Sequence, residues 1–395
     1  MTYPAMPLGD LVIPRPGTRT PATGGEATFK YVDLESVDRE KKVISSPKVT
    51  ICKNAPSRAR KVIKADDVLV SLVRPNLNAV AMVPPELDNE IASTGFCVLR
   101  ATERVLPLYV YFAVRSPTFI NGLCGLVSGA LYPAVTESQV LSQRIPVPPV
   151  EEQRRIVDRL SRAENIVRMR REAEQKAKEI IPALFLDMFG DPATNPKGWA
   201  QSSLGEVIEQ FRYGSSQKSS ANGDPVLRIP NVVGGNIDVG NLKFIDASDS
   251  DRTRYALARG DILFVRTNGN PDYVGRCAVF EPPTDQRWLY ASYLIRGRPV
   301  PDAIDPQFLQ VQLSSVEGRR RLRERARTAA GQYNINVEGL RSVPIVLPPI
   351  DLQCAFSGLV RRAKELAAGS ASASAIATAS FQSLLSGVFS ERRAT

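Results

Sequence analysis

The chain repeats itself once over almost its whole length, and this duplication limits the folds open to it. The stretch "IPVPPVEEQRRIV" (145–157) has a counterpart in "VPIVLPPIDLQCAF" (343–356). Other landmarks keep a similar offset, since Gly205 follows Gly9 by 196 residues. The period is far longer than that of a solenoid, so each copy has the size of a domain. We therefore expect two folding units of similar architecture within the 395 residues.

The composition changes once within each copy. The larger, first part is rich in Gly, Pro, Val and turn residues, with short apolar runs such as "VLVSLV" and "DILFV", and predicts a mostly β module. The stretch 151–189 instead places apolar residues every three or four positions between charged ones, which indicates a long amphipathic helix. An unbroken helix of this length would extend about 58 Å, and Pro182 predicts a kink in it.

The corresponding stretch of the second copy, 351–390, begins with similar apolar spacing and continues as "AAGSASASAIATASFQSLL". A flexible linker would explain the alanines and serines, but Ile376 and Phe381 favour a helix. Gly358 and Gly369 are expected to interrupt this helix.

A double proline precedes each long helix, at 148–149 and 348–349. Proline cannot donate to a β ladder and holds the residue before it in extended geometry, so the last strand of the module must end there. Acidic residues follow in the first helical turn, where the helix dipole favours them, and a glutamine comes next. These residues are Glu151, Glu152 and Gln153 in the first copy and Asp351 and Gln353 in the second. The motif predicts a stiff junction between module and helix.

These elements predict an α+β fold. Two mostly β modules of the same fold would be joined by two long helices packed as an antiparallel coiled coil, with a pseudo-two-fold internal repeat. Dimeric DNA readers use two-fold symmetry to meet two half-sites. A duplicated monomer whose modules have diverged would meet two different half-sites.

Lysines and arginines outnumber acidic residues by 51 to 41, which leaves a net charge of +10. This balance favours an anionic partner such as nucleic acid, although an ordinary basic protein would show it too. The start of the chain lacks the pattern of a signal peptide, and no apolar run reaches the length of a membrane span. With five scattered cysteines and no CxxC pair, the sequence predicts a cytoplasmic protein without a membrane partner.

The chain has no histidine, which excludes Ser-His-Asp and Cys-His nucleophilic machinery and most zinc catalysis. It also has no GxxxxGKS/T or GxGxxG loop and no NPPY-like stretch to hold an adenine for methylation. We therefore expect no catalytic residue, metal site or cofactor in this chain, which would act by binding.

The middle of the chain carries the most specific pattern. An apolar strand leads into PP-x-x-x-Q-x-x-I/V, a long helix and then "LFLDMFGDPATNPKGWAQSSLGEVI". This pattern resembles the specificity subunit of Type I DNA restriction–modification systems, and the resemblance extends over nearly the whole chain. The matching residues of its most specific part, 144–205, are Pro148, Pro149, Glu152, Gln153, Ile156, Phe189, Gly190, Pro196, Gly198, Trp199, Leu204 and Gly205. The second copy departs from the pattern at Leu352, the counterpart of Glu152.

The resemblance implies a non-catalytic subunit with two target-recognition domains, 1–143 and 196–342, each reading half of an asymmetric bipartite site in double-stranded DNA. Two helical regions, the central 144–195 and the distal 343–395, would act as a spacer and dock two methyltransferase subunits. Those partners would bind S-adenosylmethionine and methylate adenine, and a motor/nuclease subunit can join such complexes for cleavage.

Two small motifs of the form R-x-N-x-N follow apolar strands and are candidates for DNA contact. They are Arg74, Asn76 and Asn78 in the first copy and Arg266, Asn268 and Asn270 in the second. Arginine can bind guanine and asparagine can bind adenine in the major groove, and loops at strand ends can present them. Asparagine, proline and glycine are also ordinary turn residues, and a feature shared by both modules argues for structure, so a turn is the alternative.

Further candidates lie in the early and late loops of each module. In the early loops, Arg15, Thr18, Arg19 and Lys30 correspond broadly to Arg212, Ser216, Lys218 and Arg228. In the late loops, Tyr132 of "SGALYPAVT" corresponds to Gln332 and Tyr333 of "AGQYNINVE". A glycine beside amides and a tyrosine suits close approach to bases, and it equally suits a tight turn into the final strand.

The segment "GRRRLRERAR" (318–327) carries six arginines. Arg319, Arg323 and Arg327 lie four residues apart and are expected on one helical face. A solvated face would explain this run, and with a DNA partner so would contacts to phosphates.

Two other hypotheses stay open. The chain could be an enzyme, as a single-chain DNA methyltransferase or nuclease, although the missing motifs disfavour it. It could also be a duplicated protein–protein adaptor without a DNA role, whose binding would be insensitive to salt and to DNA sequence.

Overall fold

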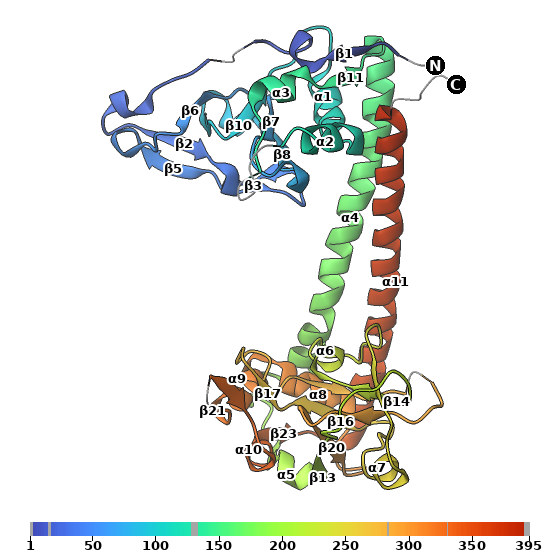
Figure 1. Ribbon diagram of the computed structural model, residues 1–395. Coiled ribbons are helices and arrows are strands. Elements are labelled where there is room, and N and C mark those ends of the chain that lie inside the picture. Colours follow the sequence, from blue (N-terminus) through green and yellow to red (C-terminus); the bar gives the residue numbers. More distant parts are fainter. Residues whose placement is uncertain (1–2, 15–16, 128–132, 283, 330, 391–395) are drawn as a thin grey trace. The chain divides into compact units, whose positions relative to one another are not determined.

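The computed structural model describes residues 3–14, 17–127, 133–282, 284–329 and 331–390. The chain divides into two compact units (Figure 1). Unit 1 comprises Met1–Ala173 and Ala371–Thr395, and unit 2 comprises the uninterrupted segment Glu174–Ser370. The division falls within both long helices, so each unit contains a part of both. The predicted domain boundaries separate helices from modules instead, and they stay a prediction.

Unit 1 is a mixed α and β module. Its strands are β1 (Ala5–Pro7), β2 (Thr28–Val32), β3 (Val37–Asp38), β4 (Val43–Ile44), β5 (Lys48–Ile51), β6 (Ala59–Val62), β7 (Val68–Ser71), β8 (Val80–Met82), β9 (Ile91–Ser93), β10 (Phe96–Leu99) and β11 (Arg144–Pro146). Its short helices are α1 (Pro107–Ala113), α2 (Pro117–Cys124) and α3 (Glu137–Ser142). The strands form the sheets β10–β7–β8 and β5–β2–β9–β6 and the pairs β1–β11 and β3–β4.

Unit 2 is built from the same kinds of element. Its strands are β12 (Ala200–Ser203), β13 (Ile208–Tyr213), β14 (Asp224–Leu227), β15 (Lys243–Ile245), β16 (Ile262–Val265), β17 (Thr267–Asn268), β18 (Cys277–Val279), β19 (Leu289–Tyr290), β20 (Leu294–Pro299), β21 (Arg327–Ala329), β22 (Gln332–Asn334) and β23 (Pro344–Leu347). Its short helices are α5 (Leu204–Val207), α6 (Ile229–Val232), α7 (Asp249–Arg254), α8 (Pro306–Ser314), α9 (Val316–Glu324) and α10 (Val337–Arg341). The sheets are β13–β20–β16–β18, β15–β14–β19 and β17–β22–β21, with the pair β12–β23.

The two units share one core topology. Each contains a parallel strand pair, β2–β9 or β14–β19, flanked by an antiparallel strand, β5 or β15. The sheet β10–β7–β8 corresponds to β20–β16–β18, and the pair β1–β11 corresponds to β12–β23. The predicted duplication of one α+β module is therefore confirmed.

A buried ion pair stands at the same place in both units. Asp67 and Asp261 precede the central strands β7 and β16, and each is 1% exposed. Arg100 donates two hydrogen bonds to Asp67 at 2.8 and 2.7 Å, and Arg298 donates two to Asp261 at 2.8 Å. This bidentate geometry compensates the buried carboxylate and fixes the central strand against its neighbour.

The two long helices are α4 (Val150–Phe189) and α11 (Ile350–Phe389), of 40 residues each. In unit 1 the first half of α4 packs on the end of α11, where Leu160 and Leu385 share one core. In unit 2 the end of α4 packs on the start of α11, where the ring centroids of Phe185 and Phe356 lie 5.8 Å apart. The helices therefore run antiparallel, as predicted. Within the described residues, neither they nor any shorter helix could span a membrane.

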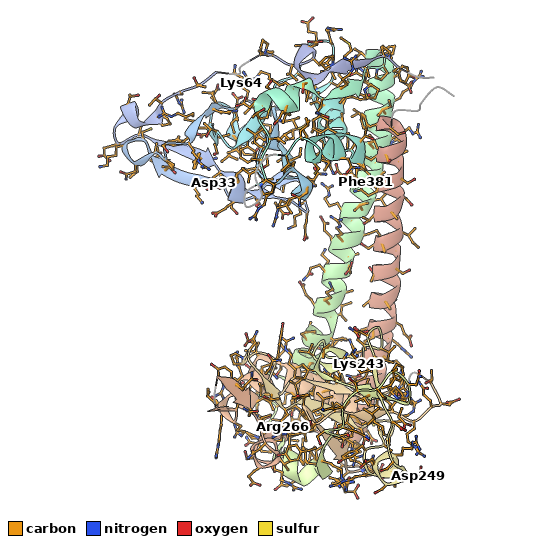
Figure 2. All side chains as sticks on the ribbon, in the orientation of Figure 1. Asp33, Lys64, Lys243, Asp249, Arg266 and Phe381 are labelled. Carbon is orange, nitrogen blue, oxygen red and sulfur yellow. The ribbon has the colours of Figure 1, made fainter. Side chains whose placement is uncertain are left out.

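Aromatic packing joins the helices to the modules. In unit 1, Phe381 of α11, labelled in Figure 2, meets Phe112 of α1 with ring centroids 6.4 Å apart, and Phe389 meets Tyr109 with centroids 5.3 Å apart. In unit 2, Phe189 of α4 meets a phenylalanine of α8 with centroids 4.8 Å apart. Because such rings bury large apolar areas, each module is fixed to the helix pair by a shared core.

Helix α11 continues through the two glycines that were expected to interrupt it. Gly358 and Gly369 lie inside Ile350–Phe389, so the expectation that they would interrupt the helix is wrong, and the linker alternative is excluded. A glycine in a helix interior costs only about 1 kcal/mol relative to alanine. The buried side chains of α11 outweigh this cost. Helix α4 likewise continues through Pro182 to its last residue.

Helix α4 ends in a specific cap. Gly190 has a positive φ of 77°, which turns the chain out of the helix. The Lys197 ammonium donates to the carbonyls of Asp187 and Met188 at 2.6 and 2.9 Å, and the Trp199 indole donates to the last helical carbonyl at 2.9 Å. The "GDPATNPKGW" segment therefore satisfies carbonyls that a helix end leaves unpaired.

Gln153 fastens α4 to unit 1 from inside the core. Its side chain is fully buried. Its carbonyl oxygen accepts from the Leu106 N–H at 2.9 Å, and its amide donates to the carbonyls of Pro148 and Arg104 at 2.9 and 3.1 Å. Leu106 is the residue before α1, so one side chain links the start of α4 to the start of a module helix.

Gln353 does the same in unit 2. It is also fully buried, accepts from the Asp305 N–H at 2.9 Å and donates to the Pro348 carbonyl at 2.7 Å. Asp305 is the residue before α8, the counterpart of α1. The stiff junction that the double proline predicted is therefore completed by the glutamine that follows it.

Helix α9 uses its first arginines to fold unit 2. The buried Glu317 accepts hydrogen bonds from Arg320 at 2.6 and 2.7 Å and from Arg321 at 2.6 Å. These bonds lower the pKa of Glu317 to about 2. Arg321 also donates to the carbonyls of Pro192 and Pro344, which ties α9 to the end of α4 and to β23.

Replacing Gln353 by leucine should weaken unit 2. The change leaves the Asp305 N–H and the Pro348 carbonyl buried without partners, at a cost of about 3 kcal/mol. The chain has two tryptophans, both in unit 2, so tryptophan fluorescence during urea unfolding reports on this unit. Gln153→Leu, the matched change in unit 1, should shift this transition less. An equal shift from both variants would contradict the assignment.

Glu317 should make unit 2 sensitive to acid. A carboxylate whose folded pKa of about 2 lies below its ordinary value of 4.5 stabilises the fold above pH 4.5, and this contribution is lost as the pH falls toward 2. Glu317→Gln should therefore lower the midpoint of urea unfolding at pH 7, as measured by tryptophan fluorescence. At pH 3 the difference in midpoint between this variant and the unchanged chain should be smaller. Glu338→Gln, on the exposed side of α10, is the matched control. A gap that is equal at both pH values would refute this role.

Candidate nucleic-acid interface

A small sheet at the surface of unit 2 gathers several of the predicted contact residues. β21 and β22 form a hairpin in which Gly331 has a positive φ of 74°, and β22 also pairs with β17. This pairing sets Tyr333 opposite Asn268. Arg327 and Gln332 are exposed on the hairpin. Residues from the late loop and from the R-x-N-x-N motif of this unit therefore meet on one surface.

Arg266, labelled in Figure 2, immediately precedes β17 of this sheet and lies beside two exposed tyrosines. Its guanidinium lies 4.7 Å from the ring centroid of Tyr213, and it donates to the Ser292 carbonyl at 3.4 Å. Its N–H donates to the Tyr293 carbonyl at 2.9 Å. Tyr213 and Tyr293 are 38% and 57% exposed. Neither tyrosine was predicted, because a tyrosine at a strand end is too common a pattern to stand out in the sequence.

The asparagines of this motif stabilise turns. Asn268 Oδ1 accepts from the Asn270 N–H at 2.9 Å, and Asn270 Oδ1 accepts from the Asp272 N–H at 2.9 Å. Such bonds are the ordinary turn chemistry of asparagine. Both side-chain oxygens therefore have the structural role that the turn alternative predicted.

The early-loop candidates of unit 2 differ in their surroundings. Arg212 donates to a backbone carbonyl of α7 at 3.1 Å, and Arg228 donates to the Asn241 carbonyl at 3.0 Å. Ser216 and Lys218 are exposed. The two arginines hold the module together, whereas the two exposed residues are free to meet solvent or a partner.

Arg319, Arg323 and Arg327 do not share one helical face. Helix α9 ends before Arg327, which begins β21, so that expectation is wrong. Arg319 donates to the carbonyls of Asp272 and Val274 at 3.1 and 2.7 Å, and burial lowers its pKa. Arg323 lies 3.1 Å from the Asp272 carboxylate. Arg327 is therefore the best placed of the three for an external anion.

The motif of unit 1 forms a tight turn. Arg74 and Asn78 have positive φ values of 51° and 48° on either side of a 3-10 turn at 75–77. The Asn78 amide donates to the Arg115 carbonyl at 3.2 Å, which gives it a structural role. Arg74 and Asn76 are exposed, so they remain candidates for contact.

The fold shows that Arg74 and Arg266 are not counterparts. In unit 1 the Leu72 N–H donates to the Gly95 carbonyl, and in unit 2 the Arg266 N–H donates to the Tyr293 carbonyl, both at 2.9 Å. These bonds join corresponding strand ends. Leu72 therefore occupies the position of Arg266, and the predicted correspondence of the two motifs is wrong by two residues.

The early loop of unit 1 runs beside β6. Thr18 and Arg19 are exposed on a segment that pairs with this strand. The Lys30 ammonium, from β2, donates to a backbone carbonyl at 3.3 Å. Arg15 and Tyr132 lie outside the described residues. Among the described residues, the structure thus brings together fewer of the predicted ones here than in unit 2.

The surface of unit 2 suits an extended polar partner. We call the side chains of Tyr213, Arg266 and Tyr293, with the β17–β22–β21 sheet, the hairpin face. Arginine and amide side chains can form paired hydrogen bonds to base edges, and tyrosines can stack on bases or sugars. These are the chemical groups with which proteins read nucleic acids.

Comparison with known proteins gives a consistent family. Residues 53–179 match the model of the Type I restriction modification DNA specificity domain. The chain is 26% identical over 335 residues to the Type I restriction enzyme EcoKI specificity subunit of Escherichia coli (strain K12), covering 80% of this chain and 71% of that protein.

Solved structures agree with this similarity. One chain, from a structure describing complex assembly and conformational transition of the type I R-M system, matches 98% of this chain and 97% of its own length, with 28% identity and a TM-score of 0.65. The Type I restriction-modification S subunit of M. genitalium shares the fold, with a TM-score of 0.60 at 13% identity, over 99% of this chain and 97% of its own. This chain belongs to the specificity subunits of Type I restriction–modification systems, which are DNA-recognition subunits and not enzymes.

Proposed function

We propose that this chain binds double-stranded DNA at an asymmetric, split target, with its first module (1–143) reading one half and its second (196–342) the other. The observation that carries the proposal is the duplication itself. One α+β topology occurs twice in a chain similar to DNA specificity subunits, and corresponding surface positions carry different side chains. Two copies of one reader with different surfaces would recognise two different short sequences.

The charge of the chain supports a nucleic-acid partner. The net charge of +10 favours DNA phosphates, which supply much of the affinity of DNA-binding proteins. Both modules have exposed basic residues that are available to contact these phosphates, such as Arg19, Arg74, Lys218 and Arg327. Phosphate contacts position a protein on DNA, while base contacts specify the sequence.

The long helices have surfaces suited to partner subunits. Ile166 and Met169 on α4 are 53% and 65% exposed, and Leu366 and Ile376 on α11 are 69% and 64% exposed. Large apolar side chains exposed on a helix surface are typical of protein contacts. We assign to the helical regions, 144–195 and 343–395, the docking of two adenine methyltransferase subunits, which would carry S-adenosylmethionine. A motor/nuclease subunit would join through the same assembly.

Exchanging residues 1–143 for the corresponding module of another family member should change one half of the methylated sequence and leave the other half unchanged. The physical reason is that each module has its own sheets and its own surface. Methylome sequencing of cells that carry the chain with its partner methyltransferase measures both halves.

Three results would contradict the proposal. A single contiguous motif, or no modified adenine, would exclude two separate readers. S-adenosylmethionine binding or DNA cleavage by the purified chain alone would favour the enzyme alternative. DNA binding that is insensitive to salt and to sequence would favour an adaptor.

A further inference from the structure

The internal repeat allows the two modules to be compared position by position. Asp67 and Asp261, each held by its bidentate arginine, are 194 residues apart, and so are Leu72 and Arg266 at the ends of the strands that follow. The bonds from Leu72 to Gly95 and from Arg266 to Tyr293 fix the neighbouring strand in the same register. The strand pairing at this place is therefore the same in both units, and the side chains at the end of the paired strands differ.

The difference is large. Unit 2 places a guanidinium and a phenol where unit 1 places the side chain of Leu72 and the hydrogen of Gly95. In unit 1 the position is also closed, because a Cβ on Gly95 would lie 3.3 Å from the methyl carbons of Leu34. In unit 2 the corresponding Tyr293 is 57% exposed.

The surroundings of Arg266 orient it for recognition. Its guanidinium lies over the Tyr213 ring at 4.7 Å, and its bond to the Ser292 carbonyl uses one terminal nitrogen. The Tyr213 hydroxyl in turn accepts from the Val337 N–H at 3.3 Å, which holds the ring against α10. An arginine stacked on an anchored ring loses less freedom when it binds, and its planar fork matches the O6 and N7 acceptors of guanine.

We propose that Arg266, supported by Tyr213, reads a guanine in the half-site of unit 2 and that Tyr293 packs beside that base. Unit 1 lacks this contact because Leu72 stands in place of Arg266 and Gly95 in place of Tyr293. This inference rests on the proposed function, because it names the residues by which one of the two modules specifies its sequence.

The test is in vitro methylation by the complex of this chain with its partner methyltransferase, followed by sequencing of the methylated adenines. Arg266→Leu should reduce discrimination at one guanine of one half-site by roughly 10- to 100-fold and leave the other half unchanged. Arg266→Lys keeps the charge but not the planar fork, so it should show the same loss of discrimination with DNA affinity largely retained. Tyr293→Gly, which copies unit 1, should relax the same half-site.

Arg254→Leu provides the matched control. Arg254 is exposed in α7, 5.5 Å from the ring centroid of Tyr255, and α7 lies on a different part of unit 2 from β17 and β21 (Figure 1). Loss of the Arg254 guanidinium should leave the methylated DNA sequence unchanged. Tryptophan fluorescence confirms that each variant of unit 2 is folded.

The outcomes separate this inference from the function on which it rests. If the unchanged complex methylates no split motif, the proposed function fails. If it does, but the half-site contains no guanine, or Arg266→Leu leaves the motif intact, the inference alone fails. An equal loss of methylation at every sequence with Arg266→Leu, and recovery with Arg266→Lys, would make Arg266 a phosphate contact and also overturn it.

Discussion

The structure depends on one buried side-chain amide at the start of each long helix. Where a β module meets a helix, a carbonyl of the double proline and the N–H before a module helix both lie in the core. Gln153 and Gln353 satisfy one of each, because a glutamine has both a donor and an acceptor. An apolar residue at these places would leave two buried groups unpaired. The double proline therefore defines the junction, and the glutamine makes it stable.

This junction has a consequence for recognition. Since each module shares its core with the helix pair, its reading surface is attached to packed side chains and not to a flexible linker. Under the proposed function, specificity then has two separate sources. The side chains of each module choose its bases, and the packed junction fixes the orientation of those side chains on the helix segments of the same unit.

The extent to which sequence predicted this structure follows from the kind of information it holds. Periodicity and duplication depend on local spacing, so the long helices, their antiparallel pairing and the repeated module could be predicted. The interface could not, because it depends on which strand ends are neighbours. Arg74 and Arg266 look alike along the chain, yet Arg74 lies two residues beyond the strand-end position that Arg266 occupies. Tyr213 and Tyr293 become candidates only because the strands bring them beside Arg266. Arg327 lies outside the helix in which it was expected, because α9 ends three residues before it.

The division of the chain also affects the order in which its two units can fold during synthesis. Unit 2 is one continuous segment that ends at Ser370, whereas unit 1 needs residues from both ends, including Phe381, Leu385 and Phe389 of its core. On the ribosome, where a chain emerges from its N-terminus, the second module can complete its core while the first still lacks its closing helix. The first module therefore passes through a period with an uncovered apolar face, and a truncated chain would leave it in that state.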